Sequence, residues 1–271
     1  MIVSERIGLI AGNGNLPIVI ARELERLGHE RFICALKGEA ETALERLASQ
    51  HEWVKLGQLK KLVQFFKTHN VTRVIMAGKV TKTNLFKGEV QPDLDMIKVI
   101  AGTKDRKDDT LLGAVAQYLE EKGIRVMNSV EYLGEALPQA GVLSKRKPSQ
   151  AFQEEIEFGW KMAKSIAALD IGQTVVTKNK SVLAVESIEG TDAAILRGGE
   201  LGAGEVNVIK VAKPDQDMRF DVPTVGLNTI NTLIQVRARL LVIEAGKTIL
   251  LDREAFLAKA NEHGMMAVAK Q

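Results

Sequence analysis

A charged segment in the second half of the chain concentrates residue types that handle phosphate groups and metal ions. From Lys213 to Gly226 the sequence reads KPDQDMRFDVPTVG, so cations, carboxylates and a proline follow one another closely. Lys213 and Arg219 could neutralise phosphate oxygens, and Asp221 could bind a divalent cation or orient a water molecule. Pro223 restricts the residue before it to extended conformations, which would hold Asp221 in place. The alternative is a solvated charged loop without chemistry.

Other acidic residues of the second half extend this set, whereas several hydrolase signatures are missing from the sequence. The acids are Asp170, Glu186, Glu189, Asp192, Asp215 and Asp217. The four histidines form no local ligand pair, which excludes an H-E-x-x-H zinc site, and the chain has neither a G-x-S-x-G elbow nor a Walker loop. Hydrolysis of a phosphate anhydride needs charge neutralisation and an oriented water molecule, which such acids and cations could provide.

A glycine-rich turn near the N-terminus, GNGNLP from Gly12 to Pro17, lies between a predicted strand and a predicted helix. Glycines at such a turn let backbone N–H groups approach a phosphate, and the helix N-terminus attracts negative charge. A dinucleotide fingerprint would place glycine at Pro17 and an acid near Leu36 and Lys37. We therefore expect a nucleotide-type phosphate loop that does not bind NAD; a plain glycine turn is the alternative.

Two further polar residues of the first half are candidates: Lys79 follows a predicted strand, and Asp108 precedes a predicted helix. Lys79 stands beside Gly78 at a strand end, which favours a phosphate contact, although a surface lysine with its amine in water is the alternative. Asp108 precedes the predicted helix Asp109–Lys122, where capping is the usual role of such an acid.

The pattern of strands and helices predicts an α/β protein with two domains. Strands alternate with amphipathic helices in residues 1–133, which is typical of a Rossmann-like parallel sheet. Residues 134–148 are rich in proline, glycine and basic residues, and we interpret them as a linker. Residues 149–271 predict a mixed α/β catalytic domain with two hairpins, Thr174–Thr177 with Val182–Ser187 and Leu240–Glu244 with Thr248–Leu251.

Composition excludes several classes of protein. The chain has 271 residues, of which 45% are hydrophobic, and a formal net charge of +3, which gives no reason to expect nucleic-acid binding. Cys34 is the only cysteine, so an internal disulfide is impossible and a reducing cytoplasm fits. No stretch of roughly 18 apolar residues predicts a membrane span, so we expect any membrane contact to be peripheral.

The motifs described above resemble, in order and spacing, those of the LpxI family of UDP-2,3-diacylglucosamine diphosphatases. The resemblance extends along nearly the whole chain, and RFDVPTVG, which ends at Gly226, carries it most clearly. The other matching runs are GLIAGNGNLP (Gly8–Pro17), AGKV (Ala77–Val80), DDTLL (Asp108–Leu112), DIGQ (Asp170–Gln173), LAVESIEGTDA (Leu183–Ala193) and AKPDQDMRFDVPTVG (Ala212–Gly226).

This resemblance implies an activity and a setting. Members of the family hydrolyse the pyrophosphate of UDP-2,3-diacylglucosamine to 2,3-diacylglucosamine 1-phosphate (lipid X) and UMP, a step of lipid A biosynthesis. Water is understood to attack the β-phosphorus, and a divalent metal, Mg²⁺ or Mn²⁺, is required. The resemblance further implies a two-domain homodimer with the substrate between its domains. It implies a cytoplasmic protein that binds peripherally to the inner membrane.

The resemblance also implies roles for particular residues. Asp221 matches the catalytic aspartate, as a metal ligand or as the base that orients water. The other matching positions imply substrate binding by Gly12, Asn13, Gly14, Leu16, Gly78, Lys79, Asp108, Gln173, Glu186, Thr191, Asp192, Lys213, Arg219 and Thr224. Asn13 and Asn15 depart from more glycine-rich versions of the first loop. A non-catalytic module that binds a nucleotide sugar or lipid is the alternative, and a nicotinamide oxidoreductase is disfavoured by the missing ribose acid.

Overall fold

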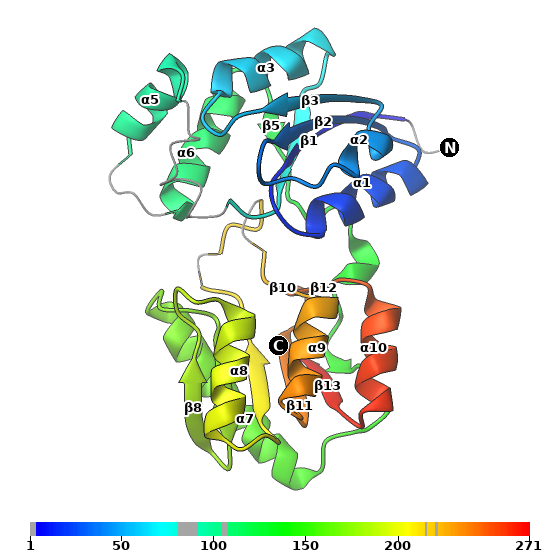
Figure 1. Ribbon diagram of the computed structural model, residues 1–271, viewed down its shortest axis with the longest axis vertical. Coiled ribbons are helices and arrows are strands. Elements are labelled where there is room, and N and C mark those ends of the chain that lie inside the picture. Colours follow the sequence, from blue (N-terminus) through cyan, green and yellow to red (C-terminus); the bar gives the residue numbers. More distant parts are fainter. Residues whose placement is uncertain (1–3, 81–91, 104–107, 215, 220–221) are drawn as a thin grey trace. The chain divides into compact units, whose positions relative to one another are not determined.

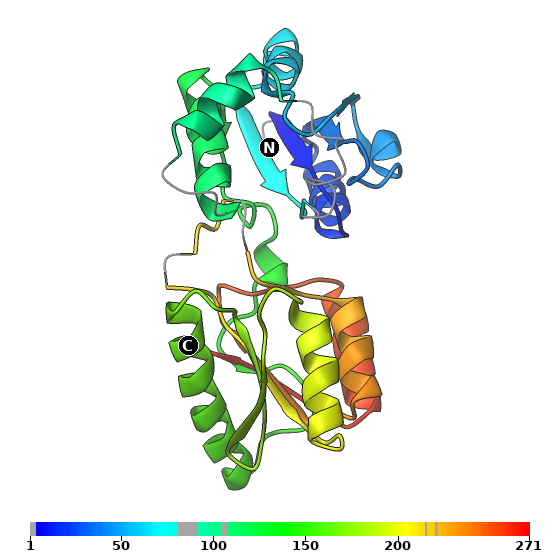
Figure 2. The same cartoon turned by 60° about the vertical axis from the view of Figure 1, so that its left-hand side comes forward.

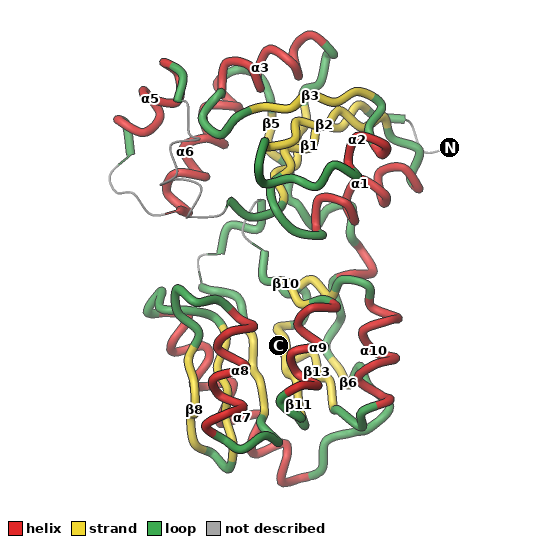
Figure 3. The backbone as a smooth tube through the Cα atoms, viewed as in Figure 1, coloured by secondary structure: helices red, strands yellow, loops and turns green. Residues whose placement is uncertain are grey.

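The chain forms two compact units in the computed structural model, which describes residues 4–80, 92–103, 108–214, 216–219 and 222–271. Unit 1 extends to Leu133 and includes Asp217–Arg219 from the second half, and unit 2 takes the rest of the chain from Gly134. In each unit the strands, yellow in Figure 3, form a central layer that helices flank. Each unit therefore has a sheet of its own on which to position functional groups.

Unit 1 alternates strands and helices along the chain, as Figure 1 shows by its colours. Its elements are β1 (Arg6–Ala11), α1 (Leu16–Arg26), β2 (Glu30–Leu36), α2 (Leu44–Leu47), β3 (Gln50–Val54), α3 (Leu59–Thr68), β4 (Arg73–Ala77), α5 (Leu94–Ala101), α6 (Asp108–Glu121) and β5 (Arg125–Val126). The sheet has the order β3-β2-β1-β4-β5, and all of its pairs are parallel. Because Ala11 pairs with both Ala35 and Ala77, the carboxyl ends of β1, β2 and β4 lie at one edge.

The core of unit 1 follows the two-residue period of its strands. One face of the sheet packs against α3, α5 and α6, which contribute Phe66, Met96 and Leu119 to a buried cluster. Strand residues of the opposite parity, such as Leu9 and Ile33, are fully buried as well, so both faces of the sheet are covered. This double burial is why the strands have almost continuous apolar sequences instead of alternating ones.

Unit 2 combines a mixed sheet with five helices in the part that the structure describes, counting one short 3₁₀ turn. Its elements are η1 (Gly134–Ala136), β6 (Gly141–Val142), α7 (Gln150–Ala168), β7 (Thr174–Lys178), β8 (Ser181–Val185), α8 (Thr191–Leu201), β9 (Asn207–Lys210), β10 (Thr224–Val225), α9 (Leu227–Gln235), β11 (Leu240–Glu244), β12 (Ile249–Leu250), α10 (Arg253–Glu262) and β13 (Met266–Lys270). The main sheet has the order β6-β13-β11-β9-β7-β8. The predicted α/β class, with a parallel sheet followed by a mixed one, is confirmed.

One of the two predicted hairpins is confirmed and the other is wrong. Strands β7 and β8 pair antiparallel across a tight turn, as expected. Strand β11 instead lies between β9 and β13 and is parallel to both, whereas β12 pairs with β10 in a separate two-stranded sheet. A turn at Ala245–Lys247 therefore redirects the chain from one sheet to another. Residues 134–148, expected to be a linker, contain η1 and β6, and β6 pairs with β13.

Neighbouring residues on the central strands of unit 2 face opposite layers. Val176, Val208 and Leu241 pack with α8, α9 and α10, whereas Val175, Ile209 and Val242 pack with α7. Figure 2 shows this arrangement, with α7 in green on one side of the sheet and the yellow, orange and red helices on the other. Among the described residues, no helix has the length and apolar character required to cross a membrane.

Candidate functional site

The glycine turn of unit 1 is joined to the loop after β4 by backbone hydrogen bonds. The Gly12 N–H donates to the Ala77 carbonyl at 2.8 Å, and Asn13 and Lys79 exchange a reciprocal pair of 2.7 and 2.9 Å. The two predicted phosphate-contact segments therefore lie together at the carboxyl edge of the sheet. The N–H groups of Gly12 and Asn13 are satisfied by the protein itself, which the sequence did not indicate.

Both loops depend on glycine for this close approach. Gly78 has φ +92°, and a Cβ there would lie 2.7 Å from the carbonyl carbon of Gly12. A Cβ on Gly12 would lie 2.6 Å from the Lys79 carbonyl oxygen. Gly14 also has a positive φ, but its Cβ would meet nothing within 4 Å. Gly12 and Gly78 are therefore required by sterics, whereas Gly14 is required by backbone conformation alone.

The first turn of α1 provides the anion-binding potential of this edge. The helix begins at Leu16 with Pro17 in its first turn, and helix geometry leaves the N–H groups of Leu16 and Ile18 without intrahelical partners. The side chain of Lys79 is exposed beside this turn. An open depression of about 620 Å³ adjoins the turn, lined by Asn13, Lys37, Gly38, Glu39, Ala40, Glu41, Thr42 and Trp53.

The predicted residue Asp108 begins α6, so it does not stand outside the helix as a cap residue would. Its side chain lies outside the described residues. Asp221, the predicted catalytic residue, also lies outside the described residues. Catalysis by Asp221 and substrate binding by Asp108 therefore stay predictions.

A buried polar cluster lies at the corresponding edge of the unit 2 sheet. The Lys210 ammonium, at the end of β9, donates to the Thr191 hydroxyl at 2.7 Å, and this hydroxyl donates to Glu186 at 2.9 Å. Lys210 and Glu186 are only 5% and 8% exposed. Thr191 is the first residue of α8, and its hydroxyl makes these two hydrogen bonds instead of capping the helix. The structure thus brings the predicted residues Glu186 and Thr191 together with a lysine that sequence analysis missed.

Several buried side-chain oxygen atoms have no hydrogen-bond partner among the described residues, and three of them bear on the predicted site. These three belong to Gln173, Glu186 and Asp192, all of which were predicted as substrate-binding residues. Gly172 explains how Gln173 comes close to Glu186, because a Cβ at Gly172 would lie 1.9 Å from the Glu186 carbonyl oxygen. A buried acceptor without a donor is costly, so these oxygens are suited to bind a donor or a cation.

A second charged cluster supports the start of the 213–226 segment. Glu244, at the end of β11, accepts hydrogen bonds from the Ala212 N–H at 2.8 Å and from the Lys164 ammonium at 3.0 Å. Its carboxylate also contacts Lys247 at 3.0 Å. Burial acts to raise the pKa of Glu244, but these hydrogen bonds outweigh it and hold the pKa below its ordinary value. Glu244 therefore stays ionised and fixes the backbone where β9 ends.

The two predicted phosphate-binding cations are engaged by carboxylates. Lys213 contacts Asp170 at 2.7 Å in unit 2. Arg219, in unit 1, makes hydrogen bonds of 2.7 to 3.1 Å with Asp217 and one of 3.2 Å with Glu120. Hydrogen bonds from Arg219 lower the pKa of Asp217 despite partial burial. Either cation would have to exchange such a partner to bind phosphate.

The remaining predicted residue, Thr224, begins the short strand β10, and its hydroxyl donates to the Val222 carbonyl at 3.0 Å. This bond closes the turn at Pro223, whose side chain is buried. The segment from Val222 to Thr224 is therefore held by a local hydrogen bond across Pro223.

The described residues contain no group of three or more His, Cys, Asp or Glu side chains placed to hold a metal ion. The unpartnered carboxylate oxygens of Glu186 and Asp192 nevertheless match the preference of Mg²⁺ and Mn²⁺ for oxygen ligands. The donor chemistry of unit 2 thus fits such a cation. Asp221, the predicted ligand, lies outside the described residues.

Lys210 and Glu244 are the polar residues that sequence analysis missed. Each ends a buried strand, NVIK or LLVIE, at the carboxyl edge of the unit 2 sheet. A charged residue in that position is a usable signal, because ligand sites of open α/β sheets gather at this edge.

Comparison with solved structures gives only weak likenesses. Glycinamide-RNase-transformylase T from Mycobacterium tuberculosis is 18% identical with a TM-score of 0.25, and the match covers 67% of this chain and 44% of that one. Phosphoribosylglycinamide synthetase from Anaerococcus prevotii is 12% identical with a TM-score of 0.28, over 69% of this chain and 40% of that one. The chain thus spans less than half of each protein, and neither likeness carries an argument.

Sequence comparison is much more specific. The LpxI N-terminal domain matches residues 6–136, and the LpxI C-terminal domain matches residues 139–268. A relative from Caulobacter vibrioides, named UDP-2,3-diacylglucosamine pyrophosphatase LpxI, is 31% identical over 274 residues, which cover 97% of this chain and 96% of the relative. Two adjoining domain matches and a full-length relative agree with the resemblance seen in the motifs. The chain belongs to the LpxI family.

Proposed function

We propose that this chain hydrolyses the pyrophosphate of UDP-2,3-diacylglucosamine to 2,3-diacylglucosamine 1-phosphate and UMP, in lipid A biosynthesis. The observation that carries the proposal is the full-length relative at 31% identity, whose name states this pyrophosphatase activity. The match of both LpxI domains along the chain supports it. The protein is thus a hydrolase that acts on a phosphoric anhydride.

The two units would contribute different groups to this reaction. In unit 1, a Rossmann-like domain in our interpretation, the first turn of α1 and the exposed Lys79 are suited to phosphate oxygens of the nucleotide. In unit 2, Lys210, Thr191 and Glu186 form a buried relay that could hold or move a proton. We assign Asp221 the catalytic role, as the residue that orients the attacking water on the β-phosphorus.

A divalent cation, Mg²⁺ or Mn²⁺, belongs to the proposal as well. Asp221 would be one ligand, and the unpartnered oxygens of Glu186 and Asp192 are further donors of the kind that these ions prefer. Such an ion would neutralise charge on the phosphate oxygens. Loss of activity on chelation, with recovery on adding Mg²⁺, would be the expected behaviour.

The proposed setting follows from the substrate and the family. The substrate carries two acyl chains, which keep such a lipid in a membrane, so the enzyme would work at the cytoplasmic surface of the inner membrane. A homodimer, which the family resemblance implies, belongs to the same proposal. We also propose that the chain divides into two domains, with boundaries near residues 133 and 149.

One experiment tests turnover, metal need and the attacked phosphorus together. The purified chain is incubated with UDP-2,3-diacylglucosamine in ¹⁸O water, with and without EDTA, and both products are analysed by mass spectrometry. We expect label in the phosphate of the lipid product and none in UMP, and little turnover with EDTA. Label in UMP would overturn the β-phosphorus assignment. Substrate binding without turnover at any metal concentration would favour the non-catalytic binding module.

A further inference from the structure

A depression lies beside the glycine turn of unit 1, on the side toward β2 and β3. Its volume is about 620 Å³, and its walls are residues 37–42 after β2, together with Asn13 and Trp53. The Lys37 N–H donates to the last carbonyl of β3 at 2.9 Å, and the Asn13 side chain donates to the Glu39 carbonyl at 3.3 Å. These bonds connect the segments that follow β1, β2 and β3, so the depression is built into the carboxyl edge of the sheet.

The position of the depression fits a ligand that extends from the first turn of α1. The N–H groups of Leu16 and Ile18 are the anion-binding groups of that turn. On the side toward β4, Asn13 and Lys79 are joined by backbone hydrogen bonds of 2.7 and 2.9 Å, so backbone occupies that side. A nucleotide whose phosphate meets α1 would therefore place its nucleoside toward β2 and β3, in the depression.

The lining of the depression suits an uncharged polar group. It contains two acidic residues, Glu39 and Glu41, and only one lysine, Lys37, so it offers no excess of positive charge to a phosphate. An acyl chain would cover these polar groups without giving them hydrogen bonds, which is costly. Of the three parts of UDP-2,3-diacylglucosamine, which are uridine, pyrophosphate and acylated sugar, the uridine matches this lining.

Trp53 gives the depression an aromatic surface. Its side chain is half-buried, and the indole N–H donates to Glu45 at 2.6 Å. This bond holds the ring and uses its single donor, so the ring itself remains for a ligand. Nucleobases stack on aromatic rings of this kind. The volume of about 620 Å³ also lies within the range of roughly 300–1,000 Å³ that is typical of small-molecule clefts.

We propose that this depression, which we call the uridine subsite, binds the uracil and ribose of the substrate. The uracil ring would lie against Trp53, and its edge would pair with backbone groups of residues 37–42, since that edge carries a donor between two acceptors. The adjoining phosphate would meet the start of α1. The inference rests on the proposed substrate and locates its nucleoside half on unit 1.

Tryptophan fluorescence tests the uridine subsite with UMP and needs no turnover. The chain has two tryptophans, so Trp160→Phe leaves Trp53 as the only one, and Trp53→Phe leaves Trp160 on α7 of unit 2. UMP should quench the emission of the Trp160→Phe variant in a saturable manner and should leave the emission of the Trp53→Phe variant nearly unchanged. Calorimetry should show that both variants still bind UMP, because phenylalanine keeps an aromatic ring.

A matched pair of alanine substitutions tests the same subsite by filling it. Ala40→Phe puts a large side chain into the lining and should lower the affinity for UMP about tenfold or more. Ala43→Phe is the control, because Ala43 is exposed at the start of α2 and does not belong to the lining. With the whole substrate, Ala40→Phe should raise KM and leave kcat nearly unchanged. Thermal melting checks that each variant is folded.

Two outcomes would overturn the uridine subsite. One is UMP binding that leaves the Trp53 emission unchanged and survives Ala40→Phe, since the nucleoside would then lie elsewhere. The other is hydrolysis of the substrate with the same KM in Ala40→Phe and Ala43→Phe, which would leave the proposed function standing without this subsite. The reverse result, UMP binding in the depression of a chain that does not hydrolyse the substrate, would support the subsite and overturn the proposed function.

Discussion

The two sheets of this protein end in different ways at their carboxyl edges. In unit 1 the loops after β1 and β4 are joined through backbone groups, and Gly12 and Gly78 allow that approach. In unit 2 the strands β9 and β11 end in Lys210 and Glu244, whose charged side chains hold the neighbouring segments. The first edge is shaped by sterics, whereas the second is shaped by charge.

This difference indicates which edge tolerates which change. The backbone hydrogen bonds that join the unit 1 loops involve no titrating group, so they should be insensitive to pH, but they should not accommodate a single added Cβ. A charged edge can take up or release protons and can bind cations, so it should respond to pH and to removal of one functional group. The proposed division of roles, phosphate contact in unit 1 and proton handling in unit 2, follows this contrast.

We expect the largest effect from a change at Asp221, because no backbone group can replace its carboxylate. We expect Asp221→Ala to lower kcat on the order of 10²-fold or more, because a group that orients water or binds metal is lost. Substrate affinity should fall much less, since the contacts of both sheet edges remain. Steady-state kinetics, substrate binding and thermal melting on one preparation measure all three.

Asp221→Asn keeps the size of the side chain and removes its charge, so it should resemble the alanine variant in kcat. Near-normal turnover by a folded Asp221→Ala protein would move the catalytic assignment to Glu186 or Asp192. That outcome would also place the whole reaction chemistry on the charged edge of unit 2.

The next largest effect is expected from adding a side chain at the carboxyl edge of the unit 1 sheet. Gly78→Ala would put a Cβ 2.7 Å from Gly12 in a backbone conformation with φ +92°, and we expect a loss of about 3 kcal/mol in the free energy of unfolding. Gly113→Ala is the control, because its Cβ meets nothing within 4 Å in the middle of α6. Urea unfolding of both variants measures the difference, and equal stability would show that the edge is not sterically closed.

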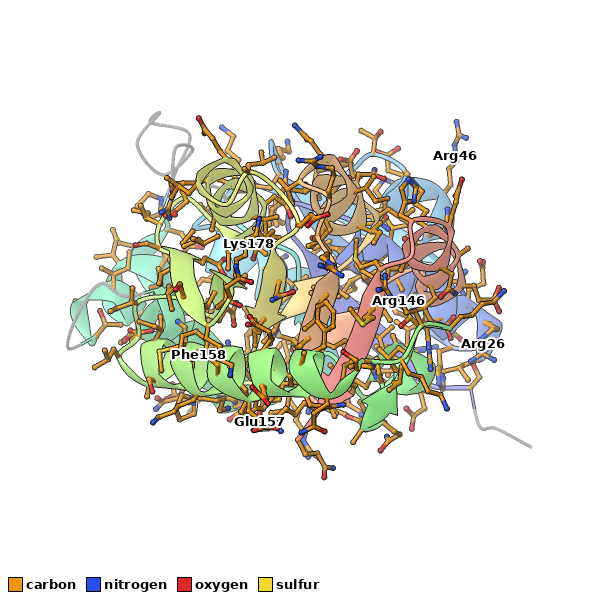
Figure 4. All side chains as sticks on the ribbon, turned by 90° about the horizontal axis from the view of Figure 1, so that it is seen from below. Arg26, Arg46, Arg146, Glu157, Phe158 and Lys178 are labelled. Atoms are coloured by element: carbon orange, nitrogen blue, oxygen red, sulfur yellow. The ribbon has the colours of Figure 1, made fainter. Side chains whose placement is uncertain are left out.

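A smaller effect distinguishes two lysines that support opposite ends of α8. Lys210 donates to Thr191 at the start of this helix, and Lys178 donates to the carbonyls of Gly202 and Gly204 at its end. Figure 4 labels Lys178 between the sheet and α8, with Glu157 and Phe158 on α7 across the sheet. We expect Lys210→Met to lower kcat about tenfold as a positioning residue, with little change in KM.

Lys178→Met is the matched control for this prediction, since it removes a lysine of the same sheet that lies away from the relay. It should lower the melting temperature and leave kcat unchanged. Equal kcat losses in the two lysine variants would reduce Lys210 to a structural residue.

The sequence predicted those features that depend on neighbouring residues. The β7–β8 hairpin and the glycine turn at Gly12 are local, and both were found in the structure. The hairpin expected at β11 was wrong, because its apolar residues fit a central parallel strand equally well and the partners β9 and β13 are distant in sequence. Glu244 was missed for the same reason, since Lys164 and Ala212 come from other elements.

The smallest expected effect is the pH response of Glu244, and its sign follows from the direction of its pKa shift. Hydrogen bonds from Ala212, Lys247 and Lys164 outweigh burial and hold the pKa of Glu244 below its ordinary value of 4.5. A depressed folded-state pKa contributes stability that is present above the unfolded-state pKa and is lost as pH falls through the folded-state value. Unit 2 should therefore lose stability below about pH 4.5.

Glu244→Gln tests this response, because glutamine keeps the shape of the side chain without a titrating carboxyl group. We expect the variant to melt a few degrees lower at pH 7 and to show a flatter decline between pH 5 and roughly pH 3.5, since one proton-linked contribution is gone. Glu154→Gln is the control, because the pKa of Glu154 is lowered by its hydrogen bond to Lys180 on the exposed surface, where water screens the pair. If Glu154→Gln flattened the profile as much as Glu244→Gln, the pH response would belong to surface charge and not to the carboxyl edge of unit 2.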